Sequence, residues 1–213
     1  MKAPGSVTGH RTSIVIPRAC QAKPEVDYEV ELAVIIGKAA KNVSKAEALD
    51  YVMGYTVAND VSARRWQKKK GQYAREASMI SRMHTTAPLT TSESFAGGGQ
   101  WVFAKSFDTF CPLGPHVVPA SLVPDPQNLR LRTLLNGETV QDGNTADMVF
   151  SVAELIAHAS QGTTLQPGTV ILTGTPSGVG YARDPPRLLQ AGDEVTCQIE
   201  GIGTLTNPVE VER

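Results

Sequence analysis

One segment, residues 26–37, constrains the fold of this chain most, because it places Glu29 and Glu31 beside a run of apolar and β-branched residues. Such a run is typical of a β-strand. Side chains two positions apart share one face of a strand, so both carboxylates should point the same way, next to the core. Two like charges there repel each other and lose hydration. A hard cation such as Mg²⁺, Mn²⁺ or Ca²⁺ resolves this conflict. The alternative is a solvated edge strand whose Glu side chains face water.

The length and the composition predict one domain spanning residues 1–213. The chain has 213 residues, of which 41% are hydrophobic and 19% are charged, as in soluble globular proteins. Its net charge of −1 gives no reason to expect a nucleic acid or an anionic membrane as partner. No apolar stretch approaches the length of a membrane span, and the N-terminus has no signal-peptide hydrophobic region.

The cysteines indicate a reducing compartment. Cys20, Cys111 and Cys197 are odd in number, widely spaced and not arranged as CxxC. This pattern argues against a disulfide framework and against a zinc site. We therefore expect a cytoplasmic protein, with a mitochondrial location as the alternative if a further segment precedes the chain.

Short strands and turns with a few helices predict a β-rich α+β domain. An Asn136-Gly137 turn predicts a hairpin. Ser44 with Glu47, and Ser151 with Glu154, predict helix N-termini of the capping-box type. The predicted strands are 12–17, 27–37, 53–59, 101–107, 129–135, 138–140, 170–173, 194–200 and 203–211, and the predicted helices are 44–52, 61–70 and 151–160. Residues 74–97 have linker composition and are predicted to form a surface insertion.

Asp60 follows the strand predicted over residues 53–59, at the expected start of a helix. Arg64 and Gln67 stand four and seven positions later, on the same helical face. An acid, a cation and an amide in this arrangement can line a pocket. The structural alternative is that Asp60 caps the helix and Arg64 is its surface partner.

Lys105 lies in a run of apolar and aromatic residues, 101–110, and needs an anionic partner or a lowered pKa if it is buried. The alternative is a lysine that extends to solvent from a strand end. Thr175 lies in the glycine-rich loop 174–180, whose N–H groups and hydroxyl can face an anion. The loop lacks the spacing of a phosphate-binding P-loop, and a plain Gly/Pro turn is the alternative.

These motifs, taken together and in order, closely resemble the fumarylacetoacetate hydrolase family. The resemblance covers nearly the whole chain except residues 73–97, and the joint match is more specific than any single motif. The matching stretches are YEVELAVIIG (28–37), DVSAR (60–64), QWVFAKSFDTF (100–110) and TGTPSGVG (173–180).

The resemblance implies a mixed β-sandwich roll, usually a homodimer, that binds one divalent metal, usually Mg²⁺. It implies that Glu29, Glu31 and Asp60 are the metal ligands. It also implies that the substrate-facing residues are Arg64, Gln67, Lys105 and Thr175, with Lys105 as the catalytic residue.

The chain departs from the family pattern in three places. The family usually carries a His and a Glu three residues apart on an upstream lid, where they act as general base, whereas this chain begins at its Met1-Lys2-Ala3-Pro4 segment. The insertion at 74–97 separates Gln67 from Lys105. Arg65 stands where relatives usually carry an acidic residue.

The implied function is a divalent-metal-dependent enzyme that acts on a small-molecule 1,3-dicarbonyl or 2-oxo acid through a metal-bound enolate. Hydrolytic C–C cleavage of an acylpyruvate-type substrate is the first expectation. Because activation of water by a general base typically contributes about 10²–10⁴-fold, lack of the His/Glu pair should weaken hydrolysis most. An oxaloacetate keto–enol tautomerase or decarboxylase is therefore the alternative, and a truncated, catalytically inactive family member is the third possibility.

Overall fold

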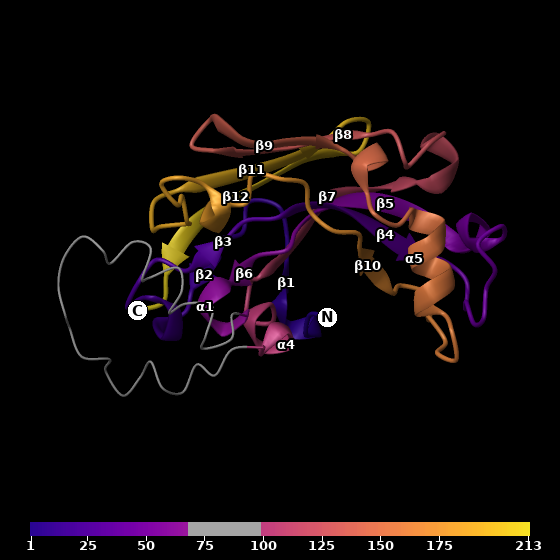
Figure 1. Cartoon of the computed structure of the whole chain (residues 1–213), viewed down its shortest axis with the longest axis horizontal. Helices are drawn as coiled ribbons and strands as arrows, with labels where there is room; N and C mark the ends of the chain where they lie inside the picture. The colour runs from indigo at the N-terminus through magenta and orange to yellow at the C-terminus, as the bar shows by residue number, and fades with distance from the viewer. Residues whose placement is uncertain (68–98) are drawn as a thin grey trace.

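The computed structural model describes residues 1–67 and 99–213, and the predicted insertion at 74–97 lies outside them. Within the described residues the strands form two five-stranded sheets and one two-stranded ribbon (Figure 1). The helices are few and short. This architecture agrees with the predicted β-rich α+β class.

The first sheet carries the acidic segment. Its strand order is β1-β7-β5-β4-β10, with β1 parallel to β7 and the other neighbours antiparallel. The strands are β1 (Val7–Thr8), β4 (Val30–Ile36), β5 (Val52–Asn59), β7 (Cys111–Pro119) and β10 (Val170–Leu172). Every residue of β4 is buried, which explains why its sequence, apart from Glu31, is apolar without alternation.

The second sheet has the order β2-β12-β11-β8-β9, with β2 parallel to β12. The strands are β2 (Ile14–Ile16), β8 (Arg130–Leu135), β9 (Glu138–Asn144), β11 (Glu194–Ile199) and β12 (Gly203–Val211). The predicted hairpin is present as β8–β9, and Asn136 and Gly137 at its turn have φ values of 53° and 83°. Positive φ at both positions is what a two-residue hairpin turn requires.

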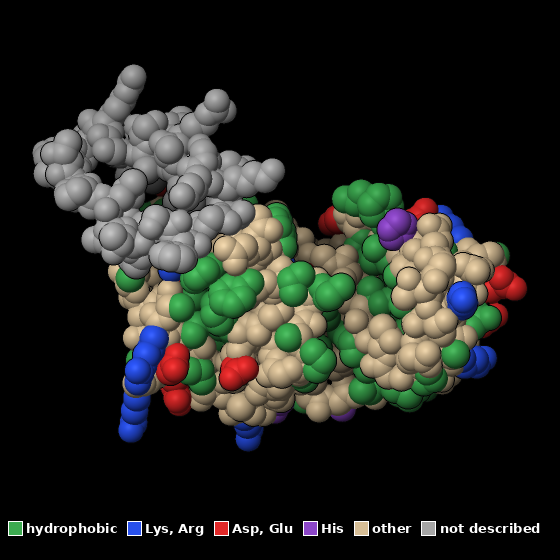
Figure 2. Space-filling view, turned by 90° about the horizontal axis from the view of Figure 1, so that it is seen from below, with side chains coloured by type: hydrophobic (Ala, Val, Ile, Leu, Met, Phe, Trp, Pro, Cys, Tyr) green, Lys and Arg blue, Asp and Glu red, His purple; other side chains and the backbone are tan. Residues whose placement is uncertain are grey.

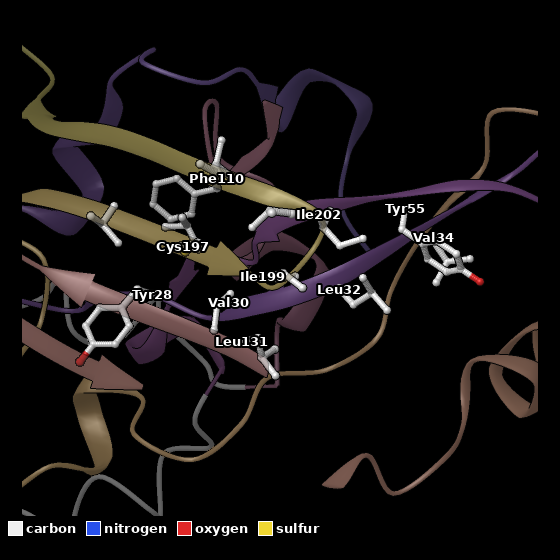
Figure 3. Packing of buried hydrophobic residues seen from close by; sticks show 14 of the residues in the cluster. Tyr28, Val30, Leu32, Val34, Tyr55, Phe110, Leu131, Cys197, Ile199 and Ile202 are labelled. Carbon is white, nitrogen blue, oxygen red and sulfur yellow. The ribbon is translucent and has the colours of Figure 1, made fainter. Parts of the chain in front are cut away.

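The hydrophobic core lies between the two sheets. Strands β11 and β12 contact β5, and β8 contacts β4. Figure 3 shows Val30 and Leu32 of β4 near Leu131 of β8 and Ile199 of β11. The ribbon of β3 (Val26–Asp27) and β6 (Ser62–Ala63) continues from the ends of β4 and β5.

The helices differ from the sequence predictions in several places. Helix α5 (Val152–Ala159) has the predicted capping box. The other helical elements are α1 (Arg64–Gln67), α4 (Trp101–Ala104) and the 3-10 turns η1 (Pro4–Ser6), η2 (Arg18–Cys20), η3 (Ala48–Tyr51), η4 (Ala120–Leu122), η5 (Thr145–Asp147) and η6 (Gly180–Ala182).

Two of those predictions were wrong. The predicted helix 44–52 is a series of turns ending in η3: the Ser44 hydroxyl donates to Glu47 Oε2, and the Glu47 N–H donates to the Ser44 main-chain carbonyl, where a helix cap would have the hydroxyl as acceptor. The predicted strand 101–107 begins as α4 instead. There the aromatic residues pack together as a cluster, with Phe103 4.9 Å from both Trp66 and Phe107, rather than alternating between two faces.

Candidate metal and substrate site

Three buried carboxylates meet where β4 begins and β5 ends. Val30 pairs with Asn59 across the two strands, so Glu29 and Asp60 lie next to each other, and the Asp60 N–H donates to the Glu29 carbonyl at 2.8 Å. Oxygens of Glu29, Glu31 and Asp60 all lie within 4.8 Å of one another. The shared face expected from the sequence is therefore present, and the edge-strand alternative is wrong because β4 lies between β5 and β10.

Lys105 follows α4 and extends its ammonium into this cluster. Its Nζ donates to Glu29 Oε2 at 3.0 Å, to Asp60 Oδ2 at 2.6 Å and to Ser62 Oγ at 2.8 Å. Burial acts to lower the pKa of Lys105, but the Glu29 and Asp60 carboxylates outweigh it and hold that pKa above its ordinary value. Lys105 is thus a charged, buried hydrogen-bond donor at neutral pH, in contrast to the solvent-directed alternative.

Arg64 is held by two carboxylates. Its Nε donates to Asp27 Oδ2 at 2.9 Å, and its Nη1 lies 2.7 Å from Glu29 Oε1 and donates to Gln67 Oε1 at 3.1 Å. The expectation that Asp60 opens a helix was wrong, because β6 intervenes and α1 begins at Arg64 itself. The alternative that Arg64 is a surface partner of Asp60 was also wrong, because Arg64 is buried and pairs with Asp27 and Glu29. Arg64 and Gln67 still share one face of α1 and reach the acidic cluster.

Asp27 organises this arrangement and was not singled out from the sequence. It is fully buried, and it accepts main-chain hydrogen bonds from Tyr28, Gly180 and Tyr181 at 2.7–3.0 Å in addition to the Arg64 contact. The Arg64 guanidinium also lies 4.6 Å from the centre of the Tyr181 ring. The signal in the sequence was the alternation Asp27, Glu29, Glu31, which has the period of a strand face.

Three buried donors at this site lack a hydrogen-bond partner among residues 1–67 and 99–213. They are Gln67 Nε2, Asn59 Nδ2 and Arg64 Nη2, the last of which still forms an ion pair with Asp27 Oδ2 at 2.9 Å. The Gln67 side-chain oxygen accepts from Arg64 Nη1, and the Asn59 side-chain oxygen accepts from the Glu29 N–H. These two hydrogen bonds assign the amide orientations, so the NH₂ group is the end without a partner in each side chain. Unpartnered buried donors are costly, so they indicate a place for an acceptor such as a substrate carboxylate.

Thr175 lies in the loop after β10, beside Glu31. The Gly174 N–H donates to Glu31 Oε2 at 2.6 Å, so the anion that this glycine-rich loop meets is a protein carboxylate. The Thr175 hydroxyl accepts from Gln141 Nε2 at 2.8 Å, and Gln141 Oε1 accepts from the Val30 N–H. Gln141 therefore connects the loop to the first residue of β4.

A cavity of 190 Å³ borders the other side of this loop and is lined by Met148, Phe150 and Leu155 in addition to residues 173–176. A larger groove of 620 Å³ runs past Arg132 on the second sheet and contains none of the predicted site residues.

The charges of the site do not balance. Within residues 1–67 and 99–213, Asp27, Glu29, Glu31 and Asp60 face three cations, Lys2, Arg64 and Lys105, which leaves one excess negative charge when all four carboxyl groups are ionised. Glu31 is the carboxylate that contacts no Lys or Arg in the described part of the chain. Burial, together with the Asp60 and Glu29 charges, raises the pKa of Glu31 to about 8. Three oxygen donors with excess negative charge fit a hard divalent cation.

Arg65 is one of the departures noted in the sequence. Its Nε lies 2.6 Å from Glu25 Oε2 and its Nη2 donates to the Ala19 carbonyl. It points toward η2 and away from the acidic cluster, so its positive charge has a local partner.

The comparisons with known proteins agree with this geometry. The family model described as "Fumarylacetoacetate (FAA) hydrolase C-terminal" matches residues 1–94 and 79–210. The chain is 46% identical over 208 residues to "Oxaloacetate tautomerase fahd2, mitochondrial" of Xenopus laevis and 45% identical to "Oxaloacetate tautomerase FAHD2A, mitochondrial" of Homo sapiens. These alignments cover 98% of this chain, which spans 56% and 57% of the length of these two relatives.

Solved structures give the same relationship. A probable 2-hydroxyhepta-2,4-diene-1,7-dioate isomerase from Mycobacterium abscessus superposes with a TM-score of 0.81 at 32% identity, covering 100% of this chain and 69% of that one. Maleylpyruvate hydrolase from Sphingobium sp. SYK-6, in complex with manganese(II) ion and pyruvate, has a TM-score of 0.76 at 30% identity, covering 100% and 64%. The chain therefore belongs to the fumarylacetoacetate hydrolase family.

Proposed function

We propose that this chain is a divalent-metal-dependent enzyme that interconverts the keto and enol forms of oxaloacetate, with Mg²⁺ as the metal. The observation that carries the proposal is the meeting of three buried carboxylates, Glu29, Glu31 and Asp60, with the Lys105 ammonium and with unpartnered donors on α1. Such a site offers a cation position and an anion position side by side.

The anion position suits a carboxylate of the substrate. Gln67 Nε2 is a buried donor without an acceptor in residues 1–67 and 99–213, and Arg64 Nη2 beside it makes only an ion-pair contact with Asp27 Oδ2 at 2.9 Å. Asp27 also accepts from Arg64 Nε, so the guanidinium is already oriented before a ligand arrives. A dicarboxylate such as oxaloacetate satisfies these donors with one carboxylate and keeps its 2-oxo group near the acidic cluster.

A divalent cation on Glu29, Glu31 and Asp60 supplies charge stabilisation for an enolate oxygen when it is bound. The protein itself contributes the Lys105 ammonium, whose raised pKa keeps a proton on Nζ. The enol O–H would first lose its proton to solvent; Lys105 would then donate its Nζ proton to the enolate carbon, which gives the keto form, and would regain a proton from solvent, so that one proton is lost and one is gained. Thr175, held by Gln141, provides a hydroxyl at the edge of the same site.

The names of several similar family members support this order of candidates. Curated relatives at 43–46% identity are named oxaloacetate tautomerases. We therefore place oxaloacetate tautomerisation, which was the alternative in the sequence analysis, ahead of hydrolytic C–C cleavage. Their names also contain "mitochondrial", so we propose a mitochondrial protein in place of the cytoplasmic one expected first. None of the described helices is long and apolar enough to cross a membrane.

We also propose that two copies of the chain associate, as the family resemblance implies. Large apolar side chains at the surface include Trp101, Val102, Phe103, Val149 and Phe150. Figure 2 shows hydrophobic side chains gathered on either side of a hollow on the face seen from below. Sedimentation at micromolar concentration distinguishes a dimer from a monomer.

The test of the function follows the absorbance of enol-oxaloacetate. The full chain is stripped with EDTA, and its rate is compared with and without Mg²⁺ and against Mg²⁺ alone. We expect Mg²⁺-dependent acceleration that falls by about 10²-fold in Lys105→Met. The matched control is Lys45→Met, because Lys45 makes a 2.7 Å contact with Glu154 on the surface, away from the site. A parent rate no greater than that of Mg²⁺ alone refutes the proposal and favours an inactive family member.

Hydrolytic cleavage of an acylpyruvate is the second candidate. The 190 Å³ cavity beside Thr175, lined by Met148, Phe150 and Leu155, has the apolar character that an acyl tail needs. Pyruvate release from an acylpyruvate, measured with a coupled dehydrogenase, tests it in the same protein preparation. Release faster than oxaloacetate tautomerisation reverses the order of the two candidates, and CO₂ release from oxaloacetate identifies a decarboxylase.

A further inference from the structure

Lys2 is a buried lysine next to the acidic cluster that the proposed reaction does not use. Its side chain is 8% exposed, and its Nζ lies 2.8 Å from Asp60 Oδ1. The same ammonium donates to the main-chain carbonyls of Val61 at 3.0 Å, Lys105 at 2.7 Å and Phe110. Burial lowers the pKa of Lys2, and Asp60 opposes that change.

The Lys2 ammonium makes two kinds of contact: hydrogen bonds to main-chain carbonyls and an ion pair with Asp60. A lysine has three N–H donors and no more. The three carbonyls take those donors, and Asp60 Oδ1 then interacts with the charge of Lys2 without a hydrogen bond of its own. Lys2 therefore ties two chain segments together through its hydrogens and holds Asp60 through its charge.

The two segments are the ones that carry the site. Val61 directly follows Asp60, at the turn between β5 and β6. Lys105 and Phe110 bound the connection between α4 and β7, from which the Lys105 side chain extends. Lys2 thus fixes the spacing between a predicted metal ligand and the predicted catalytic lysine, which are 45 positions apart in the sequence.

We infer that Lys2 is a positioning residue of this site: it occupies Oδ1 of Asp60 so that Oδ2 is the oxygen presented to the metal, and it holds the main chain of Lys105 in place. This inference rests on the proposed function, since it assumes that Asp60 is a metal ligand and that Lys105 acts on the substrate.

The two lysines differ in how firmly they are held. The contacts of Lys105 Nζ are all with side-chain oxygens, two of which belong to proposed metal ligands. Three of the contacts of Lys2 are with main-chain carbonyls that do not move independently of the fold. A divalent cation therefore competes with Lys105 for Asp60 Oδ2, whereas Lys2 keeps Oδ1 in both the metal-free and the metal-bound protein.

The test measures Mn²⁺ affinity by electron paramagnetic resonance of free Mn²⁺, with the full chain and with Lys2→Met, which keeps the length of the side chain but not its charge. Partners that orient a metal ligand typically contribute 10–100-fold to metal affinity, so we expect Mn²⁺ binding to weaken by about 10-fold or more. Lys45→Met is the matched control, with the parent affinity expected. In oxaloacetate turnover, Lys2→Met should lower kcat more than it changes KM, because the substrate donors on α1 are untouched.

A purely structural role predicts a different result, namely a lower Tm with unchanged Mn²⁺ affinity per folded protein, and that result overturns the inference. If Lys2→Met does not fold, Lys2→Ala is titrated with propylammonium and, as an uncharged control, 1-propanol. Recovery of Mn²⁺ binding with propylammonium alone supports the inference, and no recovery overturns it. If the parent chain binds Mn²⁺ but lacks tautomerase activity, the proposed function is refuted and the inference on Lys2 is not. The Mn²⁺ affinities of the parent and Lys2→Met can still be compared in that case.

Discussion

Replacing Asp27 by Asn removes one charge from the most buried carboxylate of the site without changing its size. In the parent, Asp27 accepts hydrogen bonds from three main-chain N–H groups and pairs with Arg64 at 2.9 Å. An Asn side chain has one acceptor oxygen, and its NH₂ group must face donors. The variant leaves Arg64 with Glu29 as its remaining carboxylate partner.

The size of the effect follows from burial. Removing one partner of a buried ion pair typically costs about 3–5 kcal/mol, because the other charge remains buried. For a chain of 150–250 residues, 1 kcal/mol corresponds to about 2–4 °C in Tm, so Asp27→Asn should unfold about 6–20 °C below the parent. The loss should also raise KM for oxaloacetate, since Arg64 is no longer held in its orientation.

The assay is thermal unfolding followed by tryptophan fluorescence, which gives Tm, together with urea unfolding in which the midpoint and the m-value are fitted separately. Asp142→Asn is the matched control, because Asp142 pairs with Arg130 where both side chains are about half exposed. Exposed pairs contribute little, so the control should unfold close to the parent. An Asp27→Asn variant that unfolds with the control would show that the buried network around Arg64 does not stabilise the fold as argued.

Three further outcomes are expected. In EDTA the protein should lose stability as pH rises from about 5 to 8, because burial and the neighbouring carboxylates raise the pKa of Glu31 to about 8; Mg²⁺ should remove this slope in a thermal scan. Cys111 and Cys197, whose pKa values burial raises to about 11 and 12, should resist a thiol reagent at pH 8 until urea unfolds the chain. Oxalate, an unreactive dicarboxylate, should bind in calorimetry only when Mg²⁺ is present, and equal binding in EDTA would contradict the excess negative charge of the site.

Much of the site was predictable because its residues lie on regular strand and turn patterns. Alternation placed Glu29 and Glu31 on one face, and the apolar residues after them identified β4. The Asn136-Gly137 turn and the Ser151 capping box are local signals, and both are present in the structure. The metal and substrate roles of the residues remain predictions, which the experiments above test.

Other features depend on contacts between distant segments and have no local signature. Lys2 and Asp27 act through partners that are up to 154 positions away, such as the Tyr181 N–H for Asp27. The run around Trp101 has the composition of a strand, but it forms the short helix α4. In that helix Phe103 packs on Trp66, and such aromatic contacts stabilise the helix more than the local strand preference opposes it. The partners of Lys105 could not be identified from the sequence either. The apolar residues around it indicated that it needs an anionic partner, and the fold identifies Glu29 and Asp60 as those partners.

The buried carboxylates that form the proposed metal site also reduce the stability of the fold. Four carboxylates are buried at the end of β4 and β5, where apolar side chains would stabilise the protein more. Lys2, Arg64 and Lys105 reduce that cost, and the raised pKa of Glu31, about 8, keeps a proton on this fourth carboxyl group at neutral pH when no metal is bound. A divalent cation displaces that proton and changes the net charge of the ionised cluster in the described residues from −1 to +1, which removes the repulsion and attracts a dicarboxylate. Metal binding is then part of the folding free energy as well as of the chemistry, so changes at Lys2 or Asp27 must be compared in both EDTA and Mg²⁺ to separate the two.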